Sequence, residues 1–472
     1  MTSDKKSIFT GIDGRNFLFP FLLVTSLFLL WGFCNGMIDV MDKHFQEELH
    51  LNKSQSAWVQ FAHYLGYFLM SMPAGWLASK LGYKGGIIAG LAIVSAGGFW
   101  FIPATHINAL VHEGAVSPST AFVAFLAGVC LIATGLTFLE TIANPYTTVL
   151  GDPRYAATRI NLAQSSNGVG WICGPIVGSL YFYSKDAAGH STGSQTLYIP
   201  YVGMAVVVLV LAAIFFFADM PDIKTEDDYH LDDTGSVSHS IWTHPHFVLA
   251  VAAQFLYVAA QAGIFSFFIN YMTSELPAIP IVWASRMAHL SSHAGFLQGW
   301  LQSWFETGRN GALALSDKGA SSMASLGLVF FLVGRFSGAG LLRKFAAHKI
   351  LSLYGLMNVA VTLVVFLKLG WISVACVFLT YFFMSIMFPT IFALGIFGLG
   401  ARAKKASAFI VMAIMGGAIL PKLMGYVADK FDMSRGFIVP MFCFAFVAFY
   451  GYNWPRFSRM ETIPQVKSSF GH

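Results

Sequence analysis

Charged residues are scarce in this 472-residue chain. Asp, Glu, Lys and Arg together make up 11% of it, whereas a soluble globular domain carries about 25%. Hydrophobic residues make up 56%, Phe alone occurs 45 times, and the mean hydropathy is +0.64. A soluble chain cannot bury so large an apolar fraction, because its surface has to stay polar. The composition therefore predicts a protein embedded in a lipid bilayer.

Sequence motifs of soluble chemistry are also missing. The five cysteines all lie in apolar stretches without a CxxC or metal-ligand spacing, so we interpret them as small buried hydrophobic residues. The chain has no phosphate-binding loop and no HExxH, which argues against an ATP-driven pump or a zinc enzyme and predicts no cofactor. Because Lys and Arg fall in short gaps rather than in a basic stripe, no nucleic-acid partner is expected.

Long apolar runs fill most of the chain. Each run approaches or exceeds the 20 or so residues that a helix needs to cross the bilayer core, and a backbone in lipid can satisfy its amides only by forming helices or closed barrels. The runs lack the alternation of barrel strands. We predict an all-α membrane protein with twelve transmembrane helices in two six-helix halves. The predicted spans are 17–40, 55–79, 85–104, 120–148, 160–184, 199–218, 246–272, 322–342, 350–369, 371–399, 406–428 and 436–454.

The basic residues predict the orientation. With the N-terminus in the cytoplasm, seventeen Lys and Arg residues fall on the cytoplasmic side and nine on the outer side, which follows the positive-inside rule. Both termini are therefore expected in the cytoplasm, with the protein in the inner membrane. The first run is too long for a signal peptide and lacks a clear cleavage site, so it is taken as the first span.

Two polar segments interrupt the spans. Residues 219–245 are acidic and predict a cytoplasmic linker between an N-terminal half, 1–218, and a C-terminal half, 246–472. Residues 273–321 form a long outer loop, in which the spacing of two tryptophans predicts a short interfacial helix near 295–305.

The two halves also resemble each other. A Gly followed five residues later by a Pro occurs in span five (Gly170, Pro175) and again in span eleven (Gly416, Pro421). Related halves are typical of secondary transporters, which bind substrate between them near the middle of the membrane.

Two carboxylates lie inside predicted spans. Asp39 ends span one, four residues after Asn35, and Glu140 lies deep in span four, four residues before Asn144. A charge in lipid costs about 2.5–3.5 kcal/mol or more, so both residues are candidates for binding and releasing protons. Two plainer interpretations stay open: Asp39 reaches the outer water layer, or Glu140 is the counter-ion of a buried arginine.

Neutral polar side chains accompany these carboxylates. In span two, Gln60, His63, Tyr64 and Tyr67 lie on one face of the helix. Span five carries Gln164 and Asn167, and span seven carries Gln261 and Phe265. Amides, imidazole and phenols suit the hydroxyl groups of a sugar, while aromatic faces cover its C–H side. The alternative is that they join helices to one another. An anionic substrate would need a buried Arg or Lys. Arg335 and Lys422 are the two candidates, and we expect both near span ends.

Five segments carry a resemblance to a known family. The segments are LWGFCNGMIDV (30–40), ETIANPYTTVLG (140–151), RINLAQSSNGVG (159–170), FMSIMFPTIFALGI (383–396) and AFIVMAIMGGAILP (408–421). With them the sequence resembles the fucose–galactose–glucose:proton symporters of the major facilitator superfamily, and most closely their L-fucose permeases, from about residue 17 to residue 455.

The resemblance implies a twelve-helix carrier that takes up sugar together with protons. It implies that Asp39 and Glu140 are the protonatable pair and that Gln164 and Asn167 line the sugar cavity. The chain departs from the fucose permeases at the positions of Gly36, His63, Phe265 and Phe388. L-Fucose, glucose, galactose, fructose and N-acetylglucosamine therefore all remain candidate substrates.

We expect a proton-coupled symporter of a neutral monosaccharide that works as a monomer, with sugar, protons and lipid as its partners. The alternatives are a sodium-coupled or uniporting sugar carrier, an exporter, and a sugar receptor that signals without transport. The linker of 219–245 is too short for the partner domain that a receptor needs.

Overall fold

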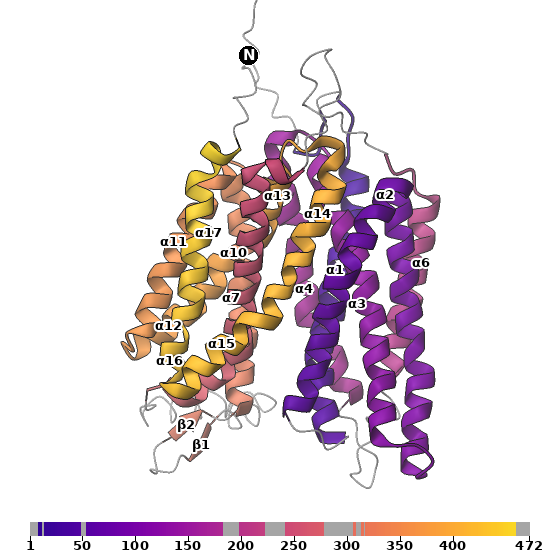
Figure 1. The fold of residues 1–472 in the computed structure, drawn as a ribbon, viewed down its shortest axis with the longest axis vertical. Coiled ribbons are helices and arrows are strands. Elements are labelled where there is room, and N and C mark those ends of the chain that lie inside the picture. The colour runs from indigo at the N-terminus through magenta and orange to yellow at the C-terminus, as the bar shows by residue number, and fades with distance from the viewer. Residues whose placement is uncertain are drawn as a thin grey trace, which may run out of the picture.

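The computed structural model describes residues 8–11, 14–48, 53–182, 198–221, 241–277, 305–307, 313–315 and 317–458. These residues form long helices that run side by side in two groups (Figure 1). The first group contains α1 (Leu18–Glu48), α2 (Lys53–His112), α3 (Pro118–Val149), the short η1 (Pro153–Tyr155), α4 (Ala156–Phe182) and α6 (Tyr198–Phe217).

The second group contains more and shorter helices. They are η2 (Ile241–Thr243), α7 (Pro245–Glu275), α10 (Asp317–Leu342), α11 (Ala347–Phe366), α12 (Trp371–Met384), α13 (Met387–Ile396), η3 (Gly400–Arg402), α14 (Ala403–Met412), η4 (Ala413–Met415), α15 (Gly416–Lys430), α16 (Met433–Gly436) and α17 (Ile438–Phe457).

Twelve membrane crossings can be assigned to the described residues. Ten helical segments are long and apolar enough to cross a membrane, and one of them, Phe61–Val111, is long enough to do so twice. It lies in α2, where Gly82 has a φ of 73° that favours glycine and separates the predicted spans 55–79 and 85–104. The twelfth is α4, a 27-residue helix that carries several amide side chains. The predicted helix class and count are confirmed.

Spans ten and eleven are broken where the sequence predicts continuous helices. Span ten consists of α12 and α13, with a break at Ser385 and Ile386, and span eleven consists of α14 and α15 joined by η4. A break frees backbone carbonyls that lipid cannot satisfy. The carbonyl of Met384 accepts from the Tyr257 hydroxyl (3.0 Å) and that of Ser385 from the Arg335 guanidinium (2.8 Å). Protein side chains thus stabilise the break.

The two groups are joined mainly near one end of the molecule, where they converge in Figure 1. There α14 packs against α2 and α3, and α13 packs against α4. A Cβ added to Gly75 in α2 would lie only 2.7 Å from the Cβ of Ala408 in α14. This is the end that the basic residues assign to the cytoplasm.

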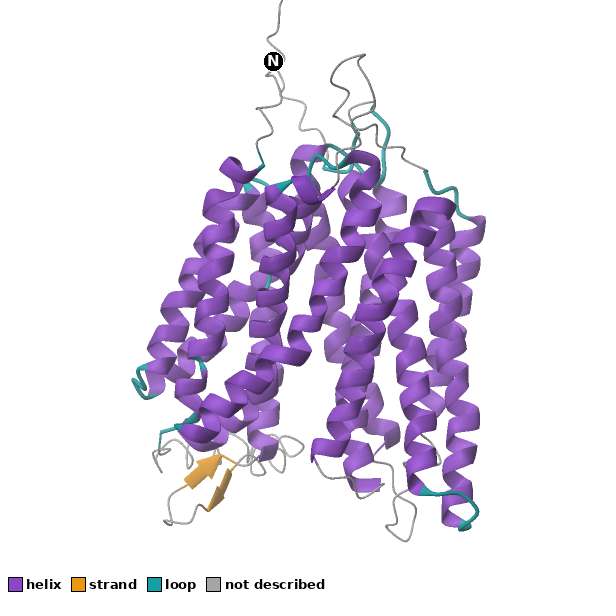
Figure 2. Ribbon diagram, viewed as in Figure 1, coloured by secondary structure: helices purple, strands orange, loops and turns teal. Residues whose placement is uncertain are grey.

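The opposite end carries the long loop between α7 and α10. Within it, β1 (Phe305–Thr307) and β2 (Leu313–Leu315) form an antiparallel pair with Phe305 opposite Leu315 (Figure 2). The interfacial helix predicted near 295–305 lies outside the described residues except for Phe305, where the prediction is wrong because that residue is paired in a strand. Residues 222–240 of the predicted linker also lie outside the described residues.

Candidate functional site

Glu140 is a buried carboxylate in the middle of α3. It is 3% exposed, and neither carboxyl oxygen has a hydrogen-bond partner among the described residues. The hydroxyl of Tyr67 in α2 is close enough to interact with it electrostatically. In this conformation no ion pair to a described residue stabilises the carboxyl group, so the interpretation of Glu140 as the counter-ion of a buried arginine is not supported.

Two amides connect α3 with α4 directly beside Glu140. Asn144, one helical turn further along α3, donates through Nδ2 to the Glu140 backbone carbonyl (3.0 Å). Its Oδ1 accepts from Nε2 of Gln164 (3.0 Å), which lies in α4. Both amide side chains are fully buried. The structure therefore brings together three residues that the sequence selected separately.

An aromatic and polar layer from α1 and α2 lies next to this group. The indole of Trp31 donates through Nε1 to the Tyr67 hydroxyl. The His63 ring lies 4.9 Å from the Tyr67 ring and 5.6 Å from that of Tyr64, measured between centroids. Asn35, Oδ1 of which has no described partner, is also buried and interacts with Tyr67. Tyr67 thus connects α1 and α2 with Glu140.

Two predicted residues of this half cannot be placed at the level of side chains. Asp39 belongs to α1, one turn after Asn35, and Gln60 belongs to α2, one turn before Tyr64. Both side chains lie outside the described residues. Their roles therefore stay predictions.

Asn167 lies where α1 and α4 are in close contact. Its side chain is buried, with Nδ2 unpaired among the described groups. A side chain on Gly32 of α1 would collide with the Asn167 backbone carbonyl, and one on Gly170 of α4 would lie 2.6 Å from the Phe33 amide nitrogen. Glycine at both positions therefore permits the close contact, and an unpaired buried amide is available to a ligand.

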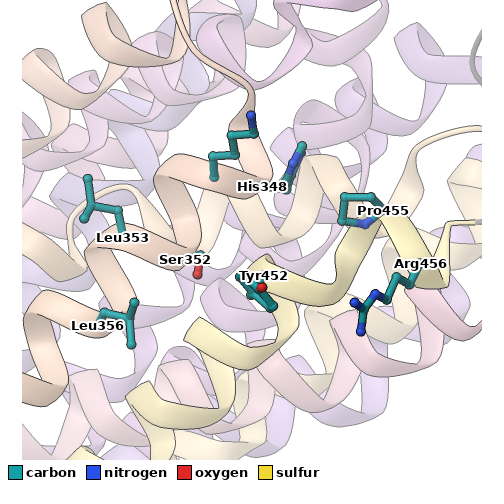
Figure 3. A pocket seen from close by; sticks show the side chains of 8 residues that line it. His348, Ser352, Leu353, Leu356, Tyr452, Pro455 and Arg456 are labelled. Atoms are coloured by element: carbon teal, nitrogen blue, oxygen red, sulfur yellow. The ribbon is translucent and has the colours of Figure 1, made fainter.

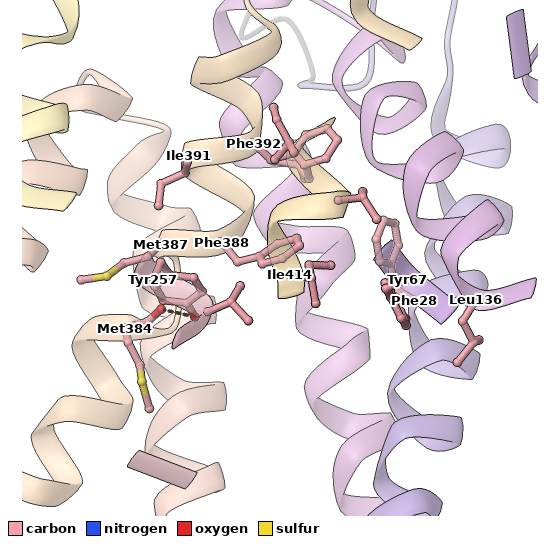
Figure 4. Packing of buried hydrophobic residues seen from close by; sticks show 14 of the residues in the cluster. Phe28, Tyr67, Leu136, Tyr257, Met384, Met387, Phe388, Ile391, Phe392 and Ile414 are labelled. Atoms are coloured by element: carbon pink, nitrogen blue, oxygen red, sulfur yellow. Dashed lines mark hydrogen bonds between the residues drawn. The ribbon is translucent and has the colours of Figure 1, made fainter. Parts of the chain in front are cut away.

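The C-terminal half contributes aromatic rings. Phe265 in α7 stacks on Tyr381 of α12 at 4.9 Å and meets Trp171 of α4 edge to face at 6.3 Å. Phe388 of α13 lies edge to face with Tyr257 at 6.4 Å and points toward Ile414 (Figure 4). Phe265 therefore contacts the N-terminal half directly.

Gln261 and Tyr64 occupy different environments. Gln261 in α7 is half-buried. The hydroxyl of Tyr64 lies against Gly417 of α15, where an added Cβ would be 2.9 Å away. Tyr64 therefore reaches across to the C-terminal half.

Arg335 is more deeply buried than we expected of a residue near a span end. It lies seven residues before the last residue of α10, Leu342, and is 3% exposed. It donates through Nη1 to the backbone carbonyl of Gln164 in α4 (2.6 Å), as well as through Nε to that of Ser385. The break in span ten supplies the second of these acceptors. Lys422, by contrast, is exposed on α15.

Two further links between the halves escaped the sequence analysis. Asn161 donates through Nδ2 to the Thr390 hydroxyl (3.1 Å), and Ser407 donates to the backbone carbonyl of Thr141 (2.8 Å). All four residues are buried. Asn161 lies one turn before Gln164, which was the available signal for its participation. For Ser407 the sequence offers no comparable signal.

Comparison with known proteins agrees with this architecture. The model of the Major Facilitator Superfamily matches residues 21–419. The chain belongs to the major facilitator superfamily. It is therefore a multi-pass membrane protein and a secondary transporter rather than an enzyme.

Individual superfamily members cover nearly the whole chain. The L-fucose-proton symporter of Escherichia coli is 33% identical over 456 residues, covering 92% of this chain and 93% of that protein. The glucose/galactose transporter of Brucella abortus is 31% identical over 438 residues, covering 93% and 94%. The solved structure of the Escherichia coli fucose:proton symporter in the outward conformation aligns with a TM-score of 0.71 at 32% identity, covering 93% and 99%. The family resemblance in the sequence is confirmed.

Proposed function

We propose that this protein is a proton-coupled symporter of a neutral monosaccharide, L-fucose or a related hexose such as glucose, galactose or N-acetylglucosamine. The observation that carries the proposal is the buried Glu140 carboxyl group, unpaired among the described residues and adjacent to the amide pair Asn144–Gln164. Relatives named for L-fucose, glucose and galactose support the class of substrate.

Protonation of Glu140 is the coupling step. The charged carboxylate is costly in an interior without an ion-pair partner, and addition of a proton removes most of that cost. A neutral Glu140 can then be enclosed while the carrier changes its open side, and sugar and proton cross together. Asp39, one turn beyond Asn35, is the proposed second proton site.

Hydrogen-bonding groups from several helices form the proposed sugar site. The N-terminal half supplies amides, an imidazole and a phenol, and the C-terminal half supplies an amide and aromatic faces. A site that satisfies buried polar groups only when a hydroxylated ligand is bound discriminates strongly against ligands without those hydroxyls. The proposed residues are Asn35, Gln60, His63, Tyr64, Asn144, Gln164, Asn167, Gln261, Phe265 and Phe388.

The two halves are the proposed moving parts. They comprise residues 1–218 and 246–472, joined by the linker 219–245, with the loop 273–321 on the outer side. The contacts Asn161–Thr390 and Ser407–Thr141 have to break when the carrier opens toward the cytoplasm. Both termini are proposed to lie in the cytoplasm, and one chain in the inner membrane forms the transporting unit.

Uptake into proteoliposomes tests the proposal. A panel of labelled hexoses is offered with an inward proton gradient, with an inward sodium gradient, and with neither. We expect accumulation of at least one neutral hexose only with the proton gradient, and its abolition by a protonophore. Accumulation driven by sodium alone, or binding without any uptake, would contradict proton symport.

A further inference from the structure

A groove lies between α11 and α17, apart from Glu140, Asn144 and Gln164 (Figure 3). Its volume is about 480 Å³. Both helices lie at the edge of the C-terminal half, away from α1 to α6 (Figure 1). The lining residues are His348, Lys349, Ser352, Leu353, Leu356, Tyr452, Pro455 and Arg456.

Close contact between the two helix backbones shapes the groove. A Cβ on Gly451 of α17 would lie 2.7 Å from the amide nitrogen of Ser352, and one on Gly355 of α11 would lie 2.9 Å from the Cβ of Ala448. Backbone atoms and small residues therefore fill the contact between α11 and α17. The larger side chains of both helices lie beside this contact and line the groove.

The end of the groove nearest the helix termini is basic. Because α11 begins at the end of the molecule where α17 finishes, Lys349 and Arg456 lie at the same end. Both are exposed, and neither forms an ion pair within the described part of the chain. Arg456 has only a long hydrogen bond of 3.5 Å to Asn453 Oδ1. Two cations are thus available to an anion.

The part of the groove further from these helix termini is apolar and exposed. Leu353 and Leu356 follow Lys349 on the same face of α11 at four and seven residues, and they are 51% and 57% exposed. Tyr452 lies one turn before Arg456 and is 71% exposed. These side chains lie on the outer surface of two membrane spans, where we expect contact with lipid chains.

We propose that this groove binds an anionic phospholipid, whose phosphate is held by Lys349 and Arg456 and whose acyl chain lies along Leu353 and Leu356. A small soluble anion would use the cations and leave the leucines unused, and a sugar would use neither. Basic pockets between transmembrane helices bind anionic lipid head groups through the same combination.

The test is lipid retention by the full chain in mild detergent, measured by native mass spectrometry and by thermal stability. Phosphatidylglycerol and phosphatidylcholine with identical acyl chains are compared. We expect retention of phosphatidylglycerol, with a raised melting temperature. The double variant Lys349→Gln/Arg456→Gln should bind it roughly thirtyfold more weakly, because each juxtamembrane cation contributes about 1 kcal/mol.

Two control variants separate the groove from general effects. Lys80→Gln/Lys405→Gln removes the same charge from the same predicted membrane face and should retain the lipid. Lys349→Arg/Arg456→Lys keeps both charges and should also retain it. An unchanged melting temperature of the lipid-free glutamine double variant excludes misfolding as the cause of its loss of lipid.

Three results would overturn the proposal. They are equal phosphatidylglycerol retention in the glutamine double variant and the unaltered chain, equal retention of phosphatidylcholine, and equal stabilisation by soluble glycerol phosphate. The last would indicate a site for small anions rather than for a lipid.

Discussion

Glu140 differs from the other acidic residues whose contacts are described. Asp152 accepts hydrogen bonds from Arg154, which lower the pKa of Asp152, and Glu275 and Asp432 both pair with Lys368. Those carboxylates are stabilised in their charged form near the ends of helices. Glu140 has no ion pair within the described residues, which supports the proposal that its protonation state follows the proton gradient.

Replacement of Glu140 tests this assignment. Glu140→Gln mimics the protonated side chain permanently, so we expect exchange of labelled for unlabelled sugar to continue while accumulation against a gradient is lost. Uptake and counterflow in proteoliposomes measure the two activities. Glu113→Gln, an exposed carboxylate between α2 and α3, is the matched control and should retain both. Full accumulation by Glu140→Gln would remove Glu140 from the coupling mechanism.

The amide pair predicts non-additive effects on sugar binding. Asn144→Ala and Gln164→Ala each remove one partner of the 3.0 Å hydrogen bond and leave the other amide partly unsatisfied. We expect each single variant to weaken sugar binding about tenfold, since a loss of roughly 1.4 kcal/mol has that effect. The double variant should lose less than the product of the two. Calorimetric titration measures all three, and strictly multiplicative losses would show that the pair does not act as a unit.

At the scale of helices, the sequence predicted spans well and breaks poorly. Apolar run length determines where a helix can cross, and the predicted limits of α3 and α6 differ from the observed ones by only one or two residues. The break at Ser385 has no such signal, because it depends on Arg335 and Tyr257 from distant segments. The proposed proton residues and the polar residues of the proposed sugar site could be selected in advance where a polar group interrupts an apolar run, as at Glu140, whereas Phe388 was selected from the family resemblance.

The hydrogen bonds of Arg335 predict how tightly the two halves are held together at the end that is proposed to face the cytoplasm. Arg335→Lys keeps the charge but lacks the planar guanidinium that reaches carbonyls in two helices at once. We expect faster amide hydrogen exchange in α4 and α13, because each lost charged hydrogen bond removes about 1.5–3 kcal/mol. Arg343→Lys, an exposed position just after α10, should leave exchange unchanged. Unchanged exchange in Arg335→Lys would mean that the bridge does not hold the halves together.

At the scale of the whole molecule, the contact of Gly75 with Ala408 offers a reversible lock. Cysteines at both positions lie close enough for a disulfide after a small outward shift, since bridged Cβ atoms are typically about 3.8 Å apart. Oxidised Gly75→Cys/Ala408→Cys should bind sugar and fail to transport it. Reduction should restore transport. Transport by the reduced double variant also shows how much activity the two larger side chains remove without the disulfide. Full transport by the oxidised protein would show that these helices need not separate.

The ion-pair cluster of Lys368, Glu275 and Asp432 predicts acid sensitivity of folding. Partial burial opposes the charged form of Asp432, but hydrogen bonds from Lys368 and from the Arg435 amide outweigh it, so its pKa lies below the usual 3.8. This stabilisation is present above pH 3.8 and is lost as the pH falls through the lowered pKa. Between about pH 5 and pH 3 the melting temperature of the unaltered chain should fall further than that of Asp432→Asn, by a few degrees at most because the pair is partly exposed. Equal falls would contradict this role.

The bond from Arg335 to the Gln164 carbonyl has a consequence for unloading. When the halves part at this end, Arg335 can keep the Ser385 carbonyl, and the Gln164 carbonyl loses its second donor while it keeps the one of its own helix. Water can take the place of the guanidinium there, next to the Gln164 side chain that is proposed to hold the sugar. The same entry of water then hydrates this carbonyl and the departing sugar. The rate of sugar release should therefore depend on how readily water reaches α4.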